Sequence, residues 1–338
     1  MTDESCHVVN TTHSNNDESD NISMHDLSIK EKICSIKLLS TYIDCLIDNI
    51  PKENIPRNMD MCFDSGAFNG LYGHGAALFI SRLEAAGYTK IHRVSGASIG
   101  SVLALMYLIN INYNLDNAFI AMQESIKTHH CLKSYREQVS IFVNTYLTAD
   151  LLSKIQGRLY ITYYDINARK QIVVSQYDSN DHVIECIMRS SHLPYLSTGE
   201  LYYKKKYMDG VYPYIFTDSV RPTFFIQLVT AYTIKNFLYV NKERNSQTRI
   251  FYGVNEANNF FMKKNSSMCS YTSDWGKLKK AEFRVREAMT YILLIIIHSL
   301  VVIASYMPKI DVTSVAYRFV LKFTNEIYGD ILSNMVNM

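Results

Sequence analysis

The sequence predicts an α/β fold with a mainly parallel central sheet. A strand–loop–helix–strand–turn–helix run between residues 59 and 110 implies parallel strands joined by a right-handed crossover. The chain has 338 residues, 48% of them hydrophobic, which is enough for one large α/β domain or two small ones. Seven of the 13 glycines fall between residues 66 and 100, so we expect the backbone to make unusual turns there.

The N-terminal part divides into two segments. Residues 1–26 are rich in Ser, Asn, Asp, Thr and His, which predicts a disordered polar tail. This tail lacks a basic start and an apolar core, so it is not a signal peptide and secretion is not expected. Residues 27–58 are expected to form an N-terminal helix and a linker. Ser28 and Glu31 form a capping box at the start of this helix, and Pro51 ends it.

Residues 59–230 are expected to form the main domain, because apolar strands and helices alternate through this region. The helix after the first strand is expected to end at Gly87, a C′ residue. The expected strands cover residues 59–64, 91–95, 159–164, 171–176, 202–208 and 224–228. The expected helices cover residues 73–86, the stretch from the elbow to about 110, most of 116–156, and 185–190.

The C-terminal part changes character twice. Residues 231–287 are polar and basic and are expected to be irregular. Residues 288–307 hold no Asp, Glu, Lys or Arg and are long enough for an apolar helix that spans a bilayer. A transmembrane span would place the basic upstream side and the main domain in the cytosol. A fully buried helix fits the same residues, so both interpretations remain open, and residues 308–338 form a C-terminal tail.

Charge and cysteine usage exclude several functions. The net charge of +2 without a basic stripe argues against nucleic acid as a partner. The seven cysteines are scattered and never form a CxxC pair, which favours reduced thiols in a cytosol-like compartment. His129-His130 is the only histidine pair, and no further ligand stands nearby, so neither a metal nor a cofactor is predicted.

The segment Gly96-Ala97-Ser98-Ile99-Gly100 matches the GxSxG pattern of a nucleophile elbow. It follows an apolar strand and precedes an apolar helix, which is the setting that this motif requires. The two glycines permit a sharp turn, and Ser98 is left at a helix N-terminus that favours developing negative charge. The alternative is a tight strand–helix turn with a helix-capping serine. We therefore take Ser98 as a candidate nucleophile.

A second glycine-rich loop lies one strand–helix unit before the elbow. It comprises Ser65, Gly66, Ala67, Phe68, Asn69 and Gly70. Backbone N–H groups in such a loop can point at the reaction centre and stabilise an oxyanion. The glycine spacing fits neither the dinucleotide fingerprint nor the P-loop.

Ser98 needs a proton acceptor, and the sequence favours an aspartate over a histidine. The only histidine well after the acid candidates is His298, which lies inside the apolar segment. Asp209 stands at the end of an apolar stretch and is followed by Gly210. Taken alone, Asp209 fits an ordinary turn before glycine. With Ser98 it makes a Ser–Asp dyad, the most economical arrangement.

Together these motifs resemble the patatin-like phospholipase family from about Met61 to Phe225. The glycine-rich loop, the elbow and the Asp209-Gly210 pair stand in the family's order and spacing, as does Arg189-Ser190-Ser191-His192-Leu193-Pro194, which is similar to its Ala-Ser-x-x-x-Pro stretch. The family has three consecutive glycines and a basic residue in the loop, where this chain has Ser65, Gly66, Ala67 and Asn69. The acid motif ends in Val211 rather than Gly or Ala.

The resemblance implies a three-layer α/β/α fold in which Ser98 attacks an ester and Asp209 accepts its proton. It also implies an oxyanion hole from Gly66, Ala67 and Ile99, no cofactor, and a phospholipid or other acyl lipid as substrate at a membrane surface. An impaired, membrane-tethered lipid-binding or scaffold protein and a lipid acyltransferase are the alternatives. Protein partners are not predicted.

Overall fold

The computed structural model describes residues 37–110, 134–194, 200–217, 220–234, 246–279 and 281–286, with a few single positions besides. The chain divides into two compact units, one ending at Cys45 and the other beginning at Leu46. Residues 37–48 are helical, and this helix ends before Pro51 as expected. The expected tail, the Ser28–Glu31 capping box and His129-His130 lie outside the described residues.

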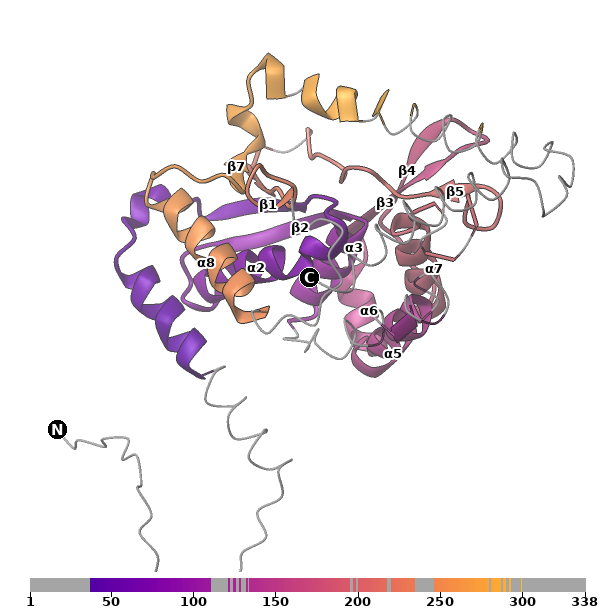
Figure 1. Ribbon diagram of the computed structural model, residues 1–338. Helices are drawn as coiled ribbons and strands as arrows, with labels where there is room; N and C mark the ends of the chain where they lie inside the picture. Colours follow the sequence, from indigo (N-terminus) through magenta and orange to yellow (C-terminus); the bar gives the residue numbers. More distant parts are fainter. Residues whose placement is uncertain are drawn as a thin grey trace, which may run out of the picture. The chain divides into compact units, whose positions relative to one another are not determined.

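The second unit is built on a seven-stranded mixed sheet in the order β4-β3-β2-β1-β6-β7, with β5 paired to β3 (Figure 1). The four central strands β3, β2, β1 and β6 are parallel to one another, which confirms the mainly parallel α/β prediction. Three short strands pair antiparallel at the margins. The bounds are β1 Asn58–Phe63, β2 Lys90–Ala97, β3 Leu159–Asp165, β4 Lys170–Val174, β5 Tyr207–Met208, β6 Thr223–Ile226 and β7 Cys269–Tyr271.

The helices follow the predicted order through the first half of the sheet. The α-helices are α2 Gly70–Ala85, α3 Ile99–Leu108, α5 Tyr135–Tyr146, α6 Ala149–Ile155, α7 Asn180–Ser190 and α8 Ser246–Phe261. Short 3₁₀ turns are η1 Lys52–Asn54, η2 Ala67–Asn69 and η4 Thr272–Asp274. Gly87 adopts φ 74° just after α2, and the next N–H bonds back to Leu83, so the predicted glycine stop is confirmed.

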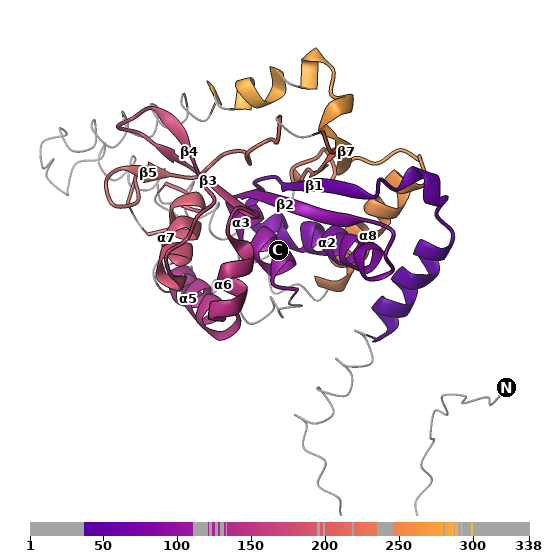
Figure 2. The same cartoon turned by 180° about the vertical axis from the view of Figure 1, so that it is seen from behind.

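Adjacent residues of β6 show how the two faces of the sheet are covered. Phe224 packs on Phe260 and Phe261 of α8, whereas Phe225 packs on Trp275 and Phe283. Side chains alternate between faces along a strand, so these two neighbours enter separate cores. Helices α2, α3 and α8 lie on one face, seen from both sides in Figures 1 and 2. The other face carries a cluster that includes Phe216 and Phe283.

The expectation that residues 231–287 are irregular is wrong. Helix α8 and strand β7 both lie there, and β7 completes the sheet beside β6, so the core does not stop at residue 230. Val254, Ala257 and Phe261 of α8 are buried at helical spacing, but the asparagines between them and Gly253 just before them hide the pattern. Gly253 of α8 leaves no room for a Cβ against Tyr72 of α2, so the two helices pack closely.

The expected strand over residues 202–208 is also wrong in extent, because only Tyr207–Met208 is a strand. Lys204 and Lys205 both have positive φ, and Tyr203 bridges back to Tyr207. The segment therefore turns on itself before it reaches β3. Polar lysines at positive φ carry no glycine signal, so the sequence pattern showed an uninterrupted strand.

The predicted apolar helix over residues 288–307 lies almost entirely outside the described residues. Within the part of the chain that the structure describes, no helix is both long and apolar enough to cross a membrane. Cys62, Cys186 and Cys269 are buried and form no disulfide with another described cysteine.

Candidate active site

Ser98 occupies a sharp turn between β2 and α3. Its backbone has φ 55° and ψ −131°, a conformation that L-residues other than glycine rarely adopt. The strand ends at Ala97 and the helix begins at Ile99, so this single residue makes the whole turn. Its side chain is 4% exposed. The strand–turn–helix setting predicted for the GxSxG motif is therefore present.

The two elbow glycines are required by close packing. A Cβ atom on Gly96 would overlap the carbonyl group of Gly100. A Cβ atom on Gly100 would lie 2.5 Å from the carbonyl oxygen of Asp64 and 2.6 Å from that of Phe63, at the end of β1. All of these neighbours are backbone atoms, which cannot move aside as a flexible side chain would. The elbow therefore packs directly on β1.

Asp209 follows β5, and its carboxyl group is buried. Its Oδ1 accepts a hydrogen bond from the Val211 N–H at 2.8 Å. Its Oδ2 makes no hydrogen bond of standard geometry within the described part of the chain, and the nearby Ser98 side chain lowers the pKa of this carboxyl. The pKa of Asp209 is raised to about 6, because burial and, to a smaller extent, the negative charge of Asp64 raise it by more than the interactions with Ser98 and Val211 lower it.

Residues at and just after the C-terminal end of α7 form hydrogen bonds both to Ser98 and to the segment that carries Asp209. The Ser190 hydroxyl accepts the Ser98 N–H at 2.9 Å, and the Ser190 carbonyl accepts the Gly210 N–H at 3.2 Å. The Asp209 N–H donates to the His192 carbonyl at 3.1 Å. Residues that are far apart in the sequence are thus fixed against each other through one short segment. Its resemblance to the Ala-Ser-x-x-x-Pro stretch was visible in the sequence, but the role of Ser190 was not.

His192 does not offer an alternative base. Its side chain is 1% exposed and its ring packs on Tyr203 with centroids 5.8 Å apart. Burial lowers the pKa of this imidazole, and neither ring nitrogen makes a hydrogen bond to the Ser98 hydroxyl. His298 lies outside the described residues. The Ser98 side chain is close enough to Asp209 to lower the pKa of that carboxyl.

The glycine-rich loop lies beside the elbow because β1 and β2 are parallel neighbours. Phe63 pairs with Gly96, so the residues that follow each strand emerge at the same edge of the sheet. The loop also touches the elbow directly, since a Cβ atom on Gly70 would contact the Ile99 side chain. The N–H groups of Gly66, Ala67 and Ile99 donate to no other described residue. They are available to an oxyanion.

Ala67 adopts φ 43°, and Val211 in the acid motif adopts φ 59°. These are two of the positions at which the chain departs from the glycine-rich pattern of the family that it resembles. The backbone therefore keeps a left-handed conformation at both positions without glycine. Such a conformation costs an L-residue on the order of 1–2 kcal/mol.

Asn69 stands where the resembling family has a basic residue, and it has a structural role. Its Nδ2 donates to the carbonyls of Leu228 and Thr233 at 2.9 and 3.1 Å, and the side chain is fully buried. A basic residue reaches the loop from elsewhere, because Arg249 of α8 donates to the Phe68 carbonyl at 3.2 Å. Three residues outside the motif thus hold the loop in place.

Asp64 and Arg286 form a buried ion pair next to the loop. Nη1 of Arg286 lies 2.7 Å from Oδ1 and 2.9 Å from Oδ2 of Asp64, whose side chain is 0% exposed. Burial raises the pKa of Asp64, and the Arg286 guanidinium lowers it. Sequence reasoning missed both residues. A charged residue at the end of an apolar strand was the available signal for Asp64, but nothing local signals Arg286.

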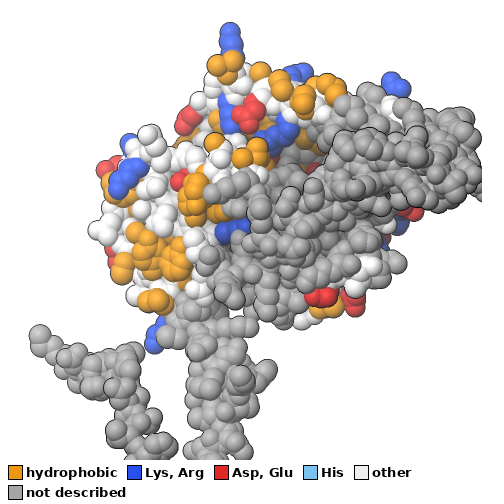
Figure 3. Space-filling view, viewed as in Figure 1, with side chains coloured by type: hydrophobic (Ala, Val, Ile, Leu, Met, Phe, Trp, Pro, Cys, Tyr) orange, Lys and Arg blue, Asp and Glu red, His pale blue; other side chains and the backbone are white. Residues whose placement is uncertain are grey.

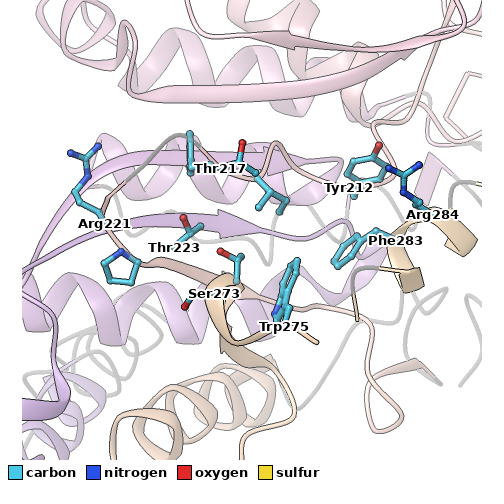
Figure 4. Close-up of a pocket in the computed structure, with 12 residues that line it drawn as sticks. Tyr212, Thr217, Arg221, Thr223, Ser273, Trp275, Phe283 and Arg284 are labelled. Atoms are coloured by element: carbon cyan, nitrogen blue, oxygen red, sulfur yellow. The ribbon is translucent and has the colours of Figure 1, made fainter. Parts of the chain in front are cut away.

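A cavity of about 690 Å³ lies on the face of the sheet that Phe225 enters. In Figure 4, Arg221 and Arg284 stand at opposite ends, with Trp275 and Phe283 between them. Its wall includes Tyr212, which follows the acid motif directly. One end of the cavity therefore borders the segment that carries Asp209.

No group of His, Cys, Asp and Glu side chains suited to holding a metal ion occurs among the described residues. On the face shown in Figure 3, acidic and basic side chains of the described residues are interspersed with hydrophobic ones. No protein family matches this chain, and no curated protein matches it significantly. The site must therefore be interpreted from its own geometry.

Proposed function

We propose that the chain is a lipid acyl hydrolase of the patatin-like kind, with Ser98 as nucleophile and Asp209 as proton acceptor. The observation that carries this proposal is the backbone of Ser98, held at φ 55° and ψ −131° near the buried carboxyl group of Asp209. A strained serine at a strand–helix turn is costly to maintain, and such strain clusters at active sites. A helix-capping serine would not need it, and Ser98 makes no side-chain cap.

The chemistry follows from the atoms at the site. Ser98 Oγ attacks the ester carbonyl carbon while its proton passes to Asp209, and the N–H groups of Gly66, Ala67 and Ile99 hold the resulting oxyanion. Asp209 then returns the proton to the leaving alcohol, which leaves an acyl-enzyme. In the second half-reaction, water gives a proton to Asp209 as its oxygen attacks the acyl carbon. The C–O bond to Ser98 then breaks, the free acid is released, and Asp209 returns the proton to Ser98 Oγ.

The substrate class is proposed from the resemblance, as a phospholipid or other acyl lipid at a membrane surface. A three-layer α/β/α arrangement belongs to the same proposal. A mixed sheet with its glycine-rich loops at the carboxyl ends of parallel strands supports it.

Labelling with a fluorophosphonate probe tests the nucleophile, because the probe reacts with activated serines. We expect wild type to be labelled and to hydrolyse p-nitrophenyl butyrate and phosphatidylcholine, and Ser98→Ala to do neither. Asp209→Asn is expected to lower the hydrolysis rate by about 10³-fold or more, in the range lost when a general base is removed. Ser81→Ala and Asp150→Asn, outside the site, serve as matched controls. Equal rates in wild type, Ser98→Ala and Asp209→Asn would refute the dyad.

A lipid-binding or scaffold protein without catalysis is the second candidate. One observation favours it. Asn69 stands where the family that the chain resembles has a basic residue, and its amide donates hydrogen bonds to the carbonyls of Leu228 and Thr233. In that case vesicles of phosphatidylcholine and phosphatidylserine would bind the protein, and Ser98 would remain unlabelled. An acyltransferase would label at Ser98 and form a new ester when glycerol is added to the assay.

A further inference from the structure

Arg286 contacts the candidate active site although it lies 222 residues after Asp64 in the sequence. It is the last of the helical residues 281–286, just before the apolar stretch. Its guanidinium clasps both oxygens of Asp64 and also reaches Glu282 at 3.5 Å on its own helix. The Arg286 side chain is 23% exposed and that of Asp64 is 0% exposed. The pair is therefore largely withdrawn from water, where charge pairing is strong and loss of one partner is costly.

Hydrogen bonds connect this ion pair to the reaction centre. Asp64 Oδ1 accepts the Ser65 N–H at 2.9 Å, which fixes the first residue of the loop. The Ser65 hydroxyl donates to the Val211 carbonyl at 2.5 Å, and the Val211 N–H donates to Asp209 Oδ1 at 2.8 Å. A continuous path of polar contacts thus runs from Arg286 through Asp64 to the proposed base.

The path also carries charge. Asp64 is close enough to Asp209 for its negative charge to raise the pKa of that carboxyl, and Arg286 opposes this charge. Two buried carboxylates in one site need a nearby cation if both are to ionise. The loop itself has no basic side chain, because Asn69 occupies that position.

We propose that Arg286 is a positioning residue of the active site, which acts through Asp64 to hold the oxyanion loop and to balance the charge beside Asp209. This inference rests on the proposed acyl hydrolase function. It makes the end of the 281–286 helix a part of the site, although the sequence places it 222 residues from Asp64.

The test compares variants of the full chain in p-nitrophenyl butyrate hydrolysis and fluorophosphonate labelling. Arg286→Gln is expected to lower kcat by about tenfold or more with little change in KM. The variant loosens the loop that stabilises the oxyanion of the transition state, but it removes no contact with the bound substrate. Arg286→Lys keeps the charge and is expected to recover most of that loss. Lys277→Gln removes a positive charge from an exposed position a few residues earlier, outside the cavity, and is expected to stay within about twofold of wild type.

Two readouts separate positioning from general destabilisation. The double variant Asp64→Asn/Arg286→Gln is expected to be more active than Arg286→Gln, since no unpaired buried carboxylate remains. In Asp64→Asn a negative charge beside Asp209 is absent, so the pKa of Asp209 is expected to fall. The decline of kcat/KM at acid pH is then expected to occur below pH 6. The other ionisable groups involved are Tyr135, which senses Asp209, and Lys279, which acts on Asp64.

Trp275 reports whether the helix remains docked. It is the only tryptophan of the chain, and it stacks on Phe283 at 5.0 Å. We expect its emission to be unchanged in Arg286→Gln. Equal activity of Arg286→Gln and Lys277→Gln would overturn the inference. A red-shifted Trp275 emission together with no rescue by lysine would overturn it as well. An inactive, unlabelled wild type would instead overturn the proposed function, and this inference with it.

Discussion

The nucleophile elbow and the oxyanion loop differ in what glycine does for them. In the elbow, Gly96 and Gly100 are needed because any Cβ would strike backbone atoms of the neighbouring strand and helix. In the loop, Ala67 takes a left-handed conformation that glycine would adopt without cost. A glycine that makes room is therefore indispensable here, whereas a glycine that only permits a positive φ has been replaced. Four substitutions test this difference between the two segments.

The largest effect is expected for Gly96→Ala. Its new Cβ meets the Gly100 backbone, so β2 and α3 must separate, at a cost on the order of 3 kcal/mol or more in unfolding free energy. Urea denaturation measures this loss. Gly87→Ala and Gly276→Ala are the controls, since a Cβ at either site meets nothing within 4 Å and only Gly87 has a positive φ. Similar losses in all three variants would refute the distinction.

The second effect concerns the negative charge of the Asp209 carboxyl group. The pKa of Asp209, raised to about 6 in the folded state, exceeds its unfolded value, so the ionised carboxylate destabilises the fold. This penalty is absent below the unfolded pKa, grows as pH rises, and is complete above about pH 6. Asp209→Asn is therefore expected to raise the unfolding free energy by up to about 3 kcal/mol at pH 8 and hardly at pH 4.

Thermal unfolding of Asp209→Asn and wild type at both pH values measures this difference, with Asp150→Asn as an exposed control. The same pKa predicts that wild-type kcat/KM falls as pH drops through about 6, because Asp209 must be ionised to accept a proton. A gain in stability that is equal at pH 4 and pH 8 would show that ionisation is not its cause.

A smaller effect of opposite sign to Gly96→Ala is expected for Ala67→Gly. Removing the Cβ relieves the left-handed strain at φ 43°, and the half-buried methyl group is a small loss. The expected gain is about 1 kcal/mol, net of the greater freedom of glycine in the unfolded chain. Chemical denaturation measures it, and Ala149→Gly at the start of α6 should show the opposite sign.

The smallest effect is expected for Val211→Gly. The substitution relieves the backbone strain of a β-branched residue at φ 59°, but it also loses packing in the cluster of Tyr164 and Met208. The net gain in unfolding free energy is expected to be roughly 0.5 kcal/mol. Val211→Ala loses the same packing with little relief of strain, so it is expected to destabilise. If Val211→Ala has a higher unfolding free energy than Val211→Gly, backbone strain at this position does not explain the difference.

Local patterns were sufficient for the elements that frame the elbow. The strand before Ser98, the helix after it and the glycine stop at Gly87 were all predicted, because each depends on contacts within a few residues. The same reasoning failed at α8, where Gly253 and several asparagines dilute the apolar spacing and tertiary packing on α2 decides the helix. It failed again at residues 202–206, where two lysines adopt turn conformations that their type does not signal.

An α/β chain with a serine at a strand–helix turn could be predicted from the residues alone, since glycine placement and apolar spacing act over short distances. The surroundings of that serine depend on tertiary packing. It brought Ser190 to the Ser98 amide, buried Asp209 enough to raise its pKa, and placed Arg286 against Asp64. These contacts join residues separated by 92 and 222 positions, so they depend on how the parallel strands align and pack, which no local pattern records.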